Sequence, residues 1–502
     1  MLRFFKTYYL PLIAALLLGV SRLPIYMGWL VFFAFVPLLS FFDGGYRSVK
    51  EHIISALIFS LGQTVLVYNW IALVTPAGLV GIWLIFSLYY FICFRILQRI
   101  WYRLPALRMP AFISIFISFE FLQNFTEMRF AWWNVGYSLA DYLPLLQALD
   151  LGGMSLLALL ILSLNYLFFQ LTQKNSRAWI GIVLIFALWY GYGRYRLLTL
   201  PMQEESSAVA VMQPSIAQED KWDNEQYQTI LNRYDELCAQ ASAEGYKLLI
   251  FPEAAIPDYL MLVPHIKQDF KELLRKHEIA VFTGFPHAES APAQHPMPFL
   301  YYNAATLFTQ DGQAHDLYYK NILVPVGERM LWLKQFPILW NLQFGQANWE
   351  FGSSITHYEF EGKEFSPSIC YELAFPHFFQ RANFTKDKQG LHKVDYHVNI
   401  TNDAWFGTSY GPWLHGIMTR FRAIESRLQF YRSANTGISM IVNPKGEILA
   451  STELFEIKNI SAKLYTSNVI PLYTRIRNYP WIFVGIAGFL FVLSFLFARR
   501  EP

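Results

Sequence analysis

Three residues of contrasting chemistry follow strand-like runs, in the order acid, amine and thiol. Glu253 ends the apolar stretch KLLIFPE, Lys320 follows two tyrosines in YYKNILVPVGE, and Cys370 lies near the end of FSPSICYE. A carboxylate can take the proton of a thiol, an ammonium can stabilise an oxyanion, and the thiolate can attack an acyl carbon. The order and setting of these residues therefore indicate acyl transfer through a cysteine nucleophile.

Cysteine by itself would not carry this interpretation, because an isolated cysteine is more often a buried core residue. The chain has three cysteines, of which Cys93 lies in an apolar run and Cys238 in an amphipathic helical pattern. They form no disulfide framework, and the cysteines and histidines lack metal-type spacing. We therefore expect neither a metal nor another cofactor.

Alternating strand and helix patterns surround the three residues. Strands are predicted at 208–214, 247–253, 279–285, 365–372 and 395–403, and helices at 225–243, 264–277 and 413–431. Two hairpins are predicted over 303–320, turning at Asp311 and Gly312, and over 439–451, turning at 444–446. Residues 286–298 hold four prolines and are predicted to be a loop whose His287 and His295 face solvent. The pattern predicts an α/β domain with antiparallel hairpins.

The remainder of the chain is strongly apolar. Of its 502 residues, 54% are hydrophobic and only 15% charged, and the apolar residues concentrate in 1–200 and near the C-terminus. Eight segments are predicted to cross a bilayer, at 7–24, 28–43, 51–72, 77–97, 110–126, 154–172, 178–196 and 479–497. The predicted organisation is a transmembrane domain of seven helices (1–200), a catalytic domain (204–470) and a C-terminal transmembrane helix (479–497). The net charge of +3 is too small to indicate a nucleic-acid partner.

The loop charges predict the orientation. Lysine and arginine lie in alternate loops, at Arg3, Lys6, Arg47, Lys50, Arg99, Arg103, Arg108, Lys174, Arg177, Arg499 and Arg500. The loops between them are poor in both residues; 127–153 has only Arg129. By the positive-inside rule both termini are cytoplasmic, and seven crossings before residue 200 place the catalytic domain on the outer side.

The ordered Glu, Lys and Cys motifs resemble the nitrilase (carbon–nitrogen hydrolase) superfamily. The block TNDAWFGTSYGPWLHGIMTRFRAIESR (401–427) and KWD (221–223) resemble its membrane-bound branch, the apolipoprotein N-acyltransferases. The resemblance implies an αββα sandwich beside eight transmembrane helices. It also implies a bacterial inner-membrane enzyme with its catalytic domain on the periplasmic side. Its acyl donor would be a phospholipid, and its acceptor a diacylglyceryl-cysteine at the N-terminus of a lipoprotein.

The resemblance also implies roles for individual residues. Glu253, Lys320 and Cys370 would be catalytic; Glu328 and Glu372 would orient Lys320 and the base; and the backbone N–H of Tyr371 would face the oxyanion. Substrate-binding candidates are Trp222, Tyr137, Trp332, Trp340, Asn402 and Trp405. The apolar stretch 331–344 is predicted to be a lid at the membrane surface, because tryptophan favours that interface. GERM (327–330) departs from the family's usual sequence, as do Gln123 and Ala131 near the membrane.

Two other functions fit parts of the sequence. A membrane hydrolase would use the same three residues with water as the second nucleophile. A catalytically silent lipoprotein-binding protein would fit the membrane segments, although it would be free to lose Glu253, Lys320 and Cys370. Four residues of the 401–427 block are expected to have structural rather than catalytic roles. His415 is expected to be a hydrogen-bonded structural residue, and Arg420, Arg422 and Arg427 to pair with internal acids.

Overall fold

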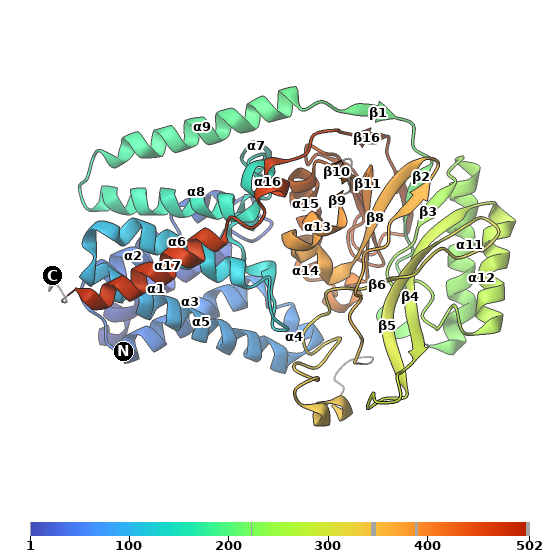
Figure 1. The fold of residues 1–502 in the computed structure, drawn as a ribbon, viewed down its shortest axis with the longest axis horizontal. Helices are drawn as coiled ribbons and strands as arrows, with labels where there is room; N and C mark the ends of the chain where they lie inside the picture. The colour runs from blue at the N-terminus through green and yellow to red at the C-terminus, as the bar shows by residue number, and fades with distance from the viewer. Residues whose placement is uncertain (1, 222, 343–347, 387–389, 498–502) are drawn as a thin grey trace.

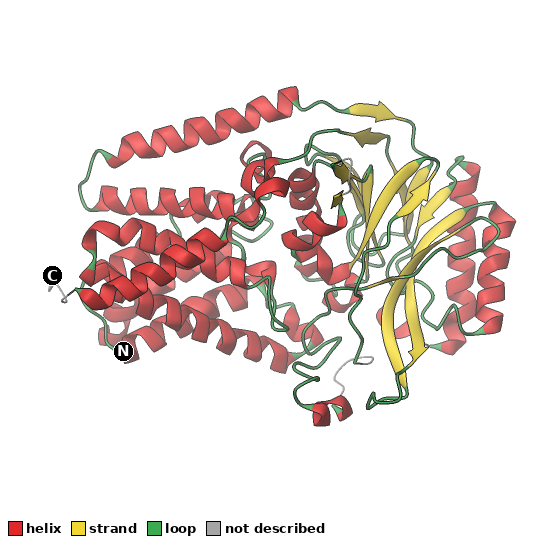
Figure 2. Ribbon diagram, in the orientation of Figure 1, coloured by secondary structure: helices red, strands yellow, loops and turns green. Residues whose placement is uncertain are grey.

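The computed structural model describes residues 2–221, 223–342, 348–386 and 390–497. Helices form one end of the molecule, and strands with their covering helices form the other (Figures 1 and 2). Each of the eight predicted apolar segments contains helix. The helices of this end are α1 (Leu2–Val20), α2 (Val36–Asp43), α3 (Val49–Val67), α4 (Ile71–Val74), α5 (Pro76–Arg103), α6 (Arg108–Leu122), α7 (Leu143–Leu146), α8 (Leu149–Thr172), α9 (Ala178–Thr199) and α17 (Trp481–Leu493).

Three of these helical stretches are both long and apolar enough to cross a bilayer. Among the described residues they are Pro76–Arg103, Pro105–Leu122 and Leu149–Thr172. The stretches Thr7–Val20, Gly28–Asp43 and Trp481–Leu496 are apolar but shorter than the roughly 20 residues that a crossing helix needs. Three helices able to cross a bilayer are therefore observed, and the arrangement of eight crossings stays a prediction.

The predicted segment 28–43 is interrupted rather than continuous. A short 3₁₀ turn (Gly28–Phe32) precedes α2, and the break between them leaves backbone groups without helical partners. Asn165 of α8 supplies those partners: its side-chain amide donates to the carbonyl of Val31 (2.9 Å) and accepts from the N–H of Phe35 (2.8 Å). Irregular backbone at membrane depth requires such pairing from neighbouring protein, because lipid offers no hydrogen bonds.

Two six-stranded sheets form the core of the other end. The first has the order β15-β2-β3-β4-β5-β6 and the second β14-β13-β12-β11-β8-β7. The strands of the first are β2 (Val209–Gln213), β3 (Leu248–Ile250), β4 (Ala280–Ser290), β5 (Phe299–Phe308), β6 (Tyr318–Tyr319) and β15 (Lys458–Ser461). Those of the second are β7 (Tyr358–Phe360), β8 (Lys363–Ile369), β11 (Tyr396–Thr401), β12 (Gln429–Ala434), β13 (Met440–Val442) and β14 (Ile448–Ser451). Strands β2, β3 and β4 run parallel, as do β8, β11 and β12, and β4–β5 and β13–β14 are antiparallel hairpins.

The two sheets pack face to face between helical layers. The ring of Phe282 on β4 lies 5.4 Å from those of Tyr358 and Phe365 on the second sheet. Helices α11 (Tyr227–Ala243) and α12 (Pro264–His277) cover the outer face of the first sheet (Figure 1). Helices α13 (Pro376–Ala382), α14 (Gly411–Gly416) and α15 (Met418–Ser426) lie between the second sheet and the helical end. The layers are αββα, and the predicted helix 264–277 is confirmed residue for residue.

Two sequence-based predictions of local structure were wrong. The predicted helix 413–431 ends at Ser426, because Arg427 adopts a left-handed conformation (φ 51°) and the chain continues as the buried strand β12. The predicted loop 286–298 begins only after Ser290, since β4 pairs with β5 up to that residue. His287 and His295 do not simply face solvent. The ring of His287 stacks on Tyr319, and that of His295 packs edge-on against Trp340.

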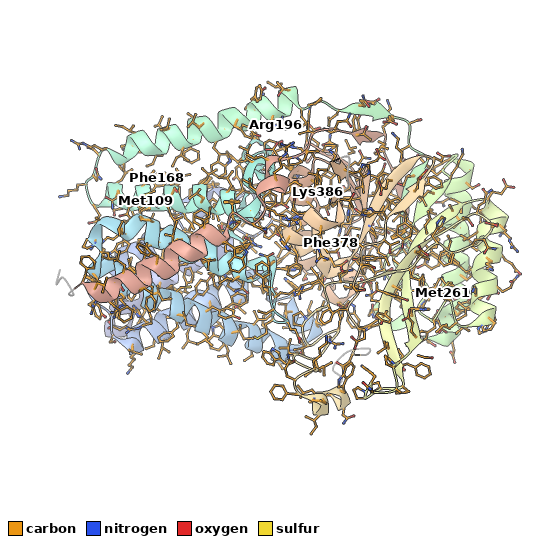
Figure 3. The ribbon with its side chains drawn as sticks, in the orientation of Figure 1. Met109, Phe168, Arg196, Met261, Phe378 and Lys386 are labelled. Atoms are coloured by element: carbon orange, nitrogen blue, oxygen red, sulfur yellow. The ribbon has the colours of Figure 1, made fainter. Side chains whose placement is uncertain are left out.

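A buried ion pair fastens the catalytic end to the helices. Asp150, in the first turn of α8, accepts from Arg427 after α15 (2.6 Å) and from Arg196 on α9 (3.0 Å; Figure 3 labels Arg196). Gly153 follows at φ 59°, where a Cβ atom would lie 2.5 Å from the ring of Tyr473. The helix therefore kinks beside the ion pair, and α16 (Leu472–Ile476) packs directly against its glycine.

Candidate active site

Cys370 lies at a sharp turn between a strand and a short 3₁₀ helix. Strand β8 ends at Ile369, and Cys370 has φ 48°, a left-handed conformation that is uncommon for a residue with a side chain. Strained backbone conformations persist only where the surrounding structure stabilises them, and they are most frequent at functional sites. Burial and the nearby Glu253 carboxylate raise the pKa of the Cys370 thiol above its usual value, with Lys320 opposing them. The resting thiol is therefore protonated and needs a base.

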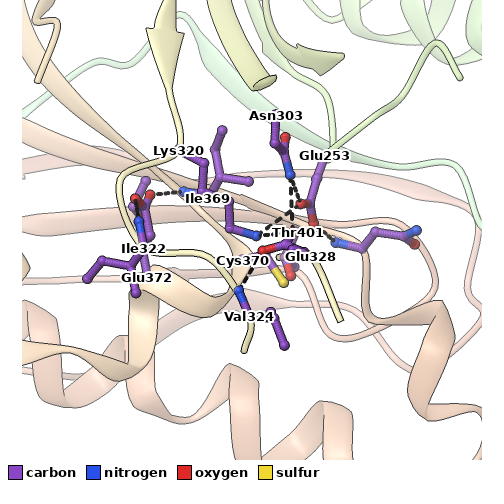
Figure 4. Close-up of polar contacts among 12 residues, drawn as sticks. Glu253, Asn303, Lys320, Ile322, Val324, Glu328, Ile369, Cys370, Glu372 and Thr401 are labelled. Carbon is purple, nitrogen blue, oxygen red and sulfur yellow. Dashed lines mark hydrogen bonds and ion pairs between the residues drawn. The ribbon is translucent and has the colours of Figure 1, made fainter. Parts of the chain in front are cut away.

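The predicted base and ammonium meet beside this turn (Figure 4). Glu253 follows β3 and Lys320 follows β6, and the Nζ of Lys320 lies 3.5 Å from Glu253 Oε1. The same ammonium donates to Glu328 Oε1 at 2.7 Å. Burial alone would lower the pKa of Lys320, but Glu328 and Glu253 raise it above its usual value. Lys320 is thus a fixed positive charge with no exposure to solvent.

Four donors hold Glu253, and three of them, from Asn303, Asn402 and Lys221, were not predicted as partners of this base. Asn303 Nδ2 donates to Oε1 at 2.7 Å, and the backbone N–H of Asn402 donates to Oε2 at 2.9 Å. Lys320 is the third donor. The fourth, the ammonium of Lys221, donates to the backbone carbonyl of Glu253 at 3.0 Å, and burial lowers its pKa to about 8. Nothing in the local sequence marks Asn303, whereas Lys221 lies in KWD (221–223), which was noted for the family resemblance but not as a partner of Glu253.

Glu372, predicted to orient Lys320 and the base, binds backbone groups beside Lys320 and Cys370, and its orienting role stays a prediction. Its carboxylate accepts from the N–H groups of Ile369 (2.7 Å), Asn321 (2.6 Å) and Ile322 (3.1 Å) and from the hydroxyl of Tyr318. Burial raises the pKa of Glu372 to about 7, with these donors opposing the shift. Glu372 joins the backbone before the nucleophile to the backbone after Lys320, so it fixes two segments relative to each other.

A buried charged cluster lies against the backbone of Cys370. His415 Nδ1 lies 2.8 Å from Asp403 Oδ1, and its Nε2 lies 3.2 Å from the carbonyl oxygen of Cys370. Arg432 donates to Asp403 Oδ2 at 2.7 Å, and with His415 it holds the pKa of that carboxyl at about 2 against the effect of burial. Ligand atoms of Cys370, Asp403 and His415 lie within 4.8 Å of one another, and the Arg432 guanidinium supplies the positive charge that a cation would bring there. The internal role expected of His415 is confirmed. Arg432 went unnoticed because it lies in β12 (Gln429–Ala434), a strand that was not predicted.

The internal pairing expected of the three arginines is confirmed for two of them. Arg422 pairs with Glu425 (3.1 Å) and Arg427 with Asp150. Arg420 instead donates to the carbonyl of Ala140, at 2.6 Å.

The predicted substrate-binding residues are placed differently from one another. Tyr137 is buried, and its hydroxyl donates to the carbonyl of Ala374, behind the nucleophile turn. Asn402 serves Glu253 through its backbone, and its side chain contacts Gln218 and Asn435. Trp405 is 45% exposed. Trp222 lies outside the described residues.

The two tryptophans of the predicted lid occupy opposite environments. Trp332 is 44% exposed. Its backbone N–H donates at 2.6 Å to the carboxylate of Glu127, a residue that follows α6. Trp340 is only 8% exposed and lies under Arg329, whose guanidinium carbon is 5.1 Å from the ring centroid. The expectation that both face the membrane is therefore wrong for Trp340. Arg329, one of the departures at 327–330, pairs with Glu350 at 3.0 Å. Residues 343 and 344 lie outside the described part of the lid.

Comparison with known proteins places the chain in a family. The carbon-nitrogen hydrolase family model matches residues 208–472, and the model of the apolipoprotein N-acyltransferase N-terminal domain matches residues 14–167. An apolipoprotein N-acyltransferase of Chlorobaculum tepidum is 28% identical, with 97% of this chain and 96% of that protein covered. One of Agrobacterium fabrum is 30% identical over 78% of this chain and 74% of its own. An amidase structure from Nesterenkonia is 18% identical at a TM-score of 0.38, covering 57% of this chain and 97% of its own. The chain belongs to the apolipoprotein N-acyltransferases, a family whose catalytic domain is a carbon–nitrogen hydrolase domain.

Proposed function

We propose that this enzyme transfers an acyl chain from a membrane phospholipid to the α-amine of a diacylglyceryl-cysteine at the N-terminus of a lipoprotein. The observation that carries the proposal is the meeting of Glu253, Lys320 and Cys370 at one turn, with a single ammonium between two carboxylates. Both substrates are lipids, which accounts for a thiol-enzyme domain fastened to a helical membrane region.

In the first half-reaction Glu253 takes the proton of the Cys370 thiol as Sγ attacks the donor's ester carbonyl. The negative charge that develops on the carbonyl oxygen is stabilised by the Lys320 ammonium and by the backbone N–H of Tyr371. The carbon–oxygen bond to glycerol then breaks, Glu253 returns the proton to the leaving oxygen, and a lysophospholipid departs. The acyl chain remains on Cys370 as a thioester.

In the second half-reaction the acceptor's α-amine attacks the thioester carbonyl. Glu253, ionised again, takes a proton from the attacking nitrogen, and the carbon–sulfur bond breaks as the amide forms. The proton returns to sulfur, and the enzyme regains its starting state. Glu328 keeps Lys320 aimed at the same point in both half-reactions, because it provides the nearer of the two anionic contacts.

We propose further that eight helices cross the bacterial inner membrane, with both termini cytoplasmic and the catalytic domain in the periplasm. The alternating loop charges support this arrangement. The start of α1 and the end of α17 lie at the same end of the helical region, away from the sheets (Figure 1), as an even number of crossings requires.

Mass spectrometry of the full-length protein in phospholipid micelles tests the chemistry. We expect an acyl adduct on the peptide holding Cys370, absent from Cys370→Ala and present in the control Cys238→Ala, whose cysteine is buried in α11. Adding a diacylglyceryl-cysteine peptide should discharge the adduct and yield an N-acylated peptide. Release of free fatty acid alone would favour the hydrolase, and a normal adduct in Cys370→Ala would exclude Cys370 as the nucleophile.

A further inference from the structure

A cavity of about 440 Å³ lies where the helical region meets the catalytic domain. Phe378 of α13 lines it, and Figure 3 shows this residue between the helices and the sheets. The polar side chains that line it come from four separate segments, and they are Asn124, Glu127, Arg129, Asn321, Ser353, His377 and Arg381.

The cavity carries more positive than negative charge. Arg129 and Arg381 form no ion pair within the described residues; Arg129 donates to the carbonyl of Thr126 (2.8 Å), and Arg381 is exposed. Glu127 is the one acid that lines the cavity, and its carboxylate already accepts from the backbone of Trp332. Burial lowers the pKa of His377, and Arg477 and Arg381 lower it further. Unpaired guanidinium groups beside a neutral imidazole suit an oxyanion such as phosphate.

Two lining residues connect the cavity to the segments that carry the catalytic groups. Tyr371, which follows the nucleophile, donates from its hydroxyl to the carbonyl of Arg129 at 2.8 Å. Asn321, another lining residue, directly follows Lys320 in the chain. A ligand in this cavity is therefore held by segments that are continuous with the reacting site.

The other side of the cavity adjoins the membrane helices. The ring of Phe125, just beyond α6, lies 5.8 Å from that of the lining residue His377 and 5.6 Å from that of Trp481 at the start of α17. The cavity therefore lies at the level where apolar helices give way to the polar domain, which is where lipid head groups lie. In a glycerophospholipid only the glycerol unit separates the phosphate from the acyl esters. A phosphate site for an acyl donor must accordingly lie next to the thiol.

We propose that this cavity binds the phosphodiester of the acyl donor's head group, with Arg381 and Arg129 pairing with its oxygens. The inference rests on the proposed function, because it assigns the donor's charged end to a site beside the thioester chemistry. The site selects lipids with an anionic phosphate over uncharged glycerides of the same acyl composition.

The test compares two donors in mixed micelles with full-length protein. One donor is dioleoyl phosphatidylethanolamine and the other dioleoylglycerol, which has the same acyl chains and no phosphate. The rate of acyl-adduct formation on Cys370 is measured against donor concentration.

Arg381→Gln should raise the half-saturating phospholipid concentration roughly tenfold, as expected for a lost charge-assisted hydrogen bond, with little change in the maximal rate. The change with dioleoylglycerol should be far smaller. Arg381→Lys should recover part of the effect, and Arg275→Gln, an exposed arginine on α12, is the matched control.

Each outcome bears on the proposal. Equal changes with both donors, or no change with either, would overturn it. Inorganic phosphate should compete only in the phospholipid series, and Arg381→Gln should abolish that competition. If phosphate slowed adduct formation equally with both donors, the cavity would be a site for free phosphate rather than for the lipid head group, and the proposal would be overturned. If the unaltered enzyme formed no adduct with either donor, the proposed function itself would fail, which is a distinguishable result.

Discussion

The Lys320 ammonium has two roles that can be separated by substitution. It neutralises two carboxylates in the folded enzyme, and in the proposed mechanism it stabilises the oxyanion. Lys320→Met removes the charge while keeping a long unbranched side chain. The second variant combines Lys320→Met with Glu328→Gln, which also removes the nearer carboxylate.

The distances give the size of the expected effect. Nζ lies 2.7 Å from Glu328 and 3.5 Å from Glu253, so at an effective dielectric constant of about 20 the attractions are about 6 and about 5 kcal/mol. Desolvation of the charges offsets part of both. Leaving buried charges unpaired costs about 3 to 5 kcal/mol, which is a fall of roughly 6 to 20 °C in the unfolding midpoint for a domain of this size. Because Glu328 accounts for slightly more than half of the attraction, the double variant should regain about half of the lost stability.

Thermal unfolding in detergent and acyl-adduct formation are measured on the same preparations. We expect the double variant to be more stable than Lys320→Met yet equally slow in adduct formation, at least ~10²-fold below the unaltered enzyme. The control cycle is Lys247→Met with Glu361→Gln. That pair has a similar separation of 2.9 Å but lies exposed, so it should show no measurable coupling.

Two results would refute this reasoning. An unchanged midpoint in Lys320→Met would mean that the carboxylates do not depend on the ammonium. A double variant that acylated at a near-normal rate would remove Lys320 from the chemistry, and the nitrilase-type mechanism with it.

Three further predictions follow from the structure. Burial lowers the pKa of Lys221 to about 8 from 10.5, so the folded state binds fewer protons between those values. Stability should therefore rise from pH 8 to 10.5, by about 3 kcal/mol relative to Lys221→Met, and parallel stability curves would contradict this. Trp340→Ala should lower the unfolding free energy by about 3 to 5 kcal/mol, whereas exposed Trp332→Ala should chiefly raise the half-saturating lipid concentration; equal destabilisation would remove the distinction. A reporter fused to the C-terminus should be cytoplasmic and one inserted within 291–298 periplasmic, and finding both on one side would refute the eight-crossing topology.

The sequence was most informative where chemistry and local pattern coincide. Glu253, Lys320 and Cys370 each end or follow a strand-like run, and strand ends on packed sheets can converge, as Figure 4 shows for these three. The helix 264–277 could be predicted to its ends because it combines an amphipathic period, a proline at its first turn and a cluster of basic residues in its last.

Long-range partners left no comparable signal. Asn303 and Lys221 bind Glu253 from 50 and 32 residues away, and an asparagine or lysine beside an apolar strand looks the same whether or not it has such a partner. The predicted helix 413–431 ran into the start of β12, because this strand is buried along its whole length and its apolar residues do not alternate. Trp340 was misplaced for a related reason: the guanidinium of Arg329 and the ring of His295, which cover it, come from other segments.

The ion pair formed by Asp150 and Arg427 has a consequence for where substrates can reach the thiol. It ties the first turn of α8 to the end of α15 through buried charges, and breaking such a pair is costly. This pair resists movement of the catalytic domain along the helices, so in the proposed topology Cys370 keeps one height above the bilayer. In the proposed reaction two lipid substrates must reach that height in turn, one with an ester and the other with an amine. The enzyme should therefore select substrates by the height of the reacting group above the membrane. We expect it to reject an ester or amine that a longer spacer moves away from the level of the lipid glycerol groups, whatever its reactivity.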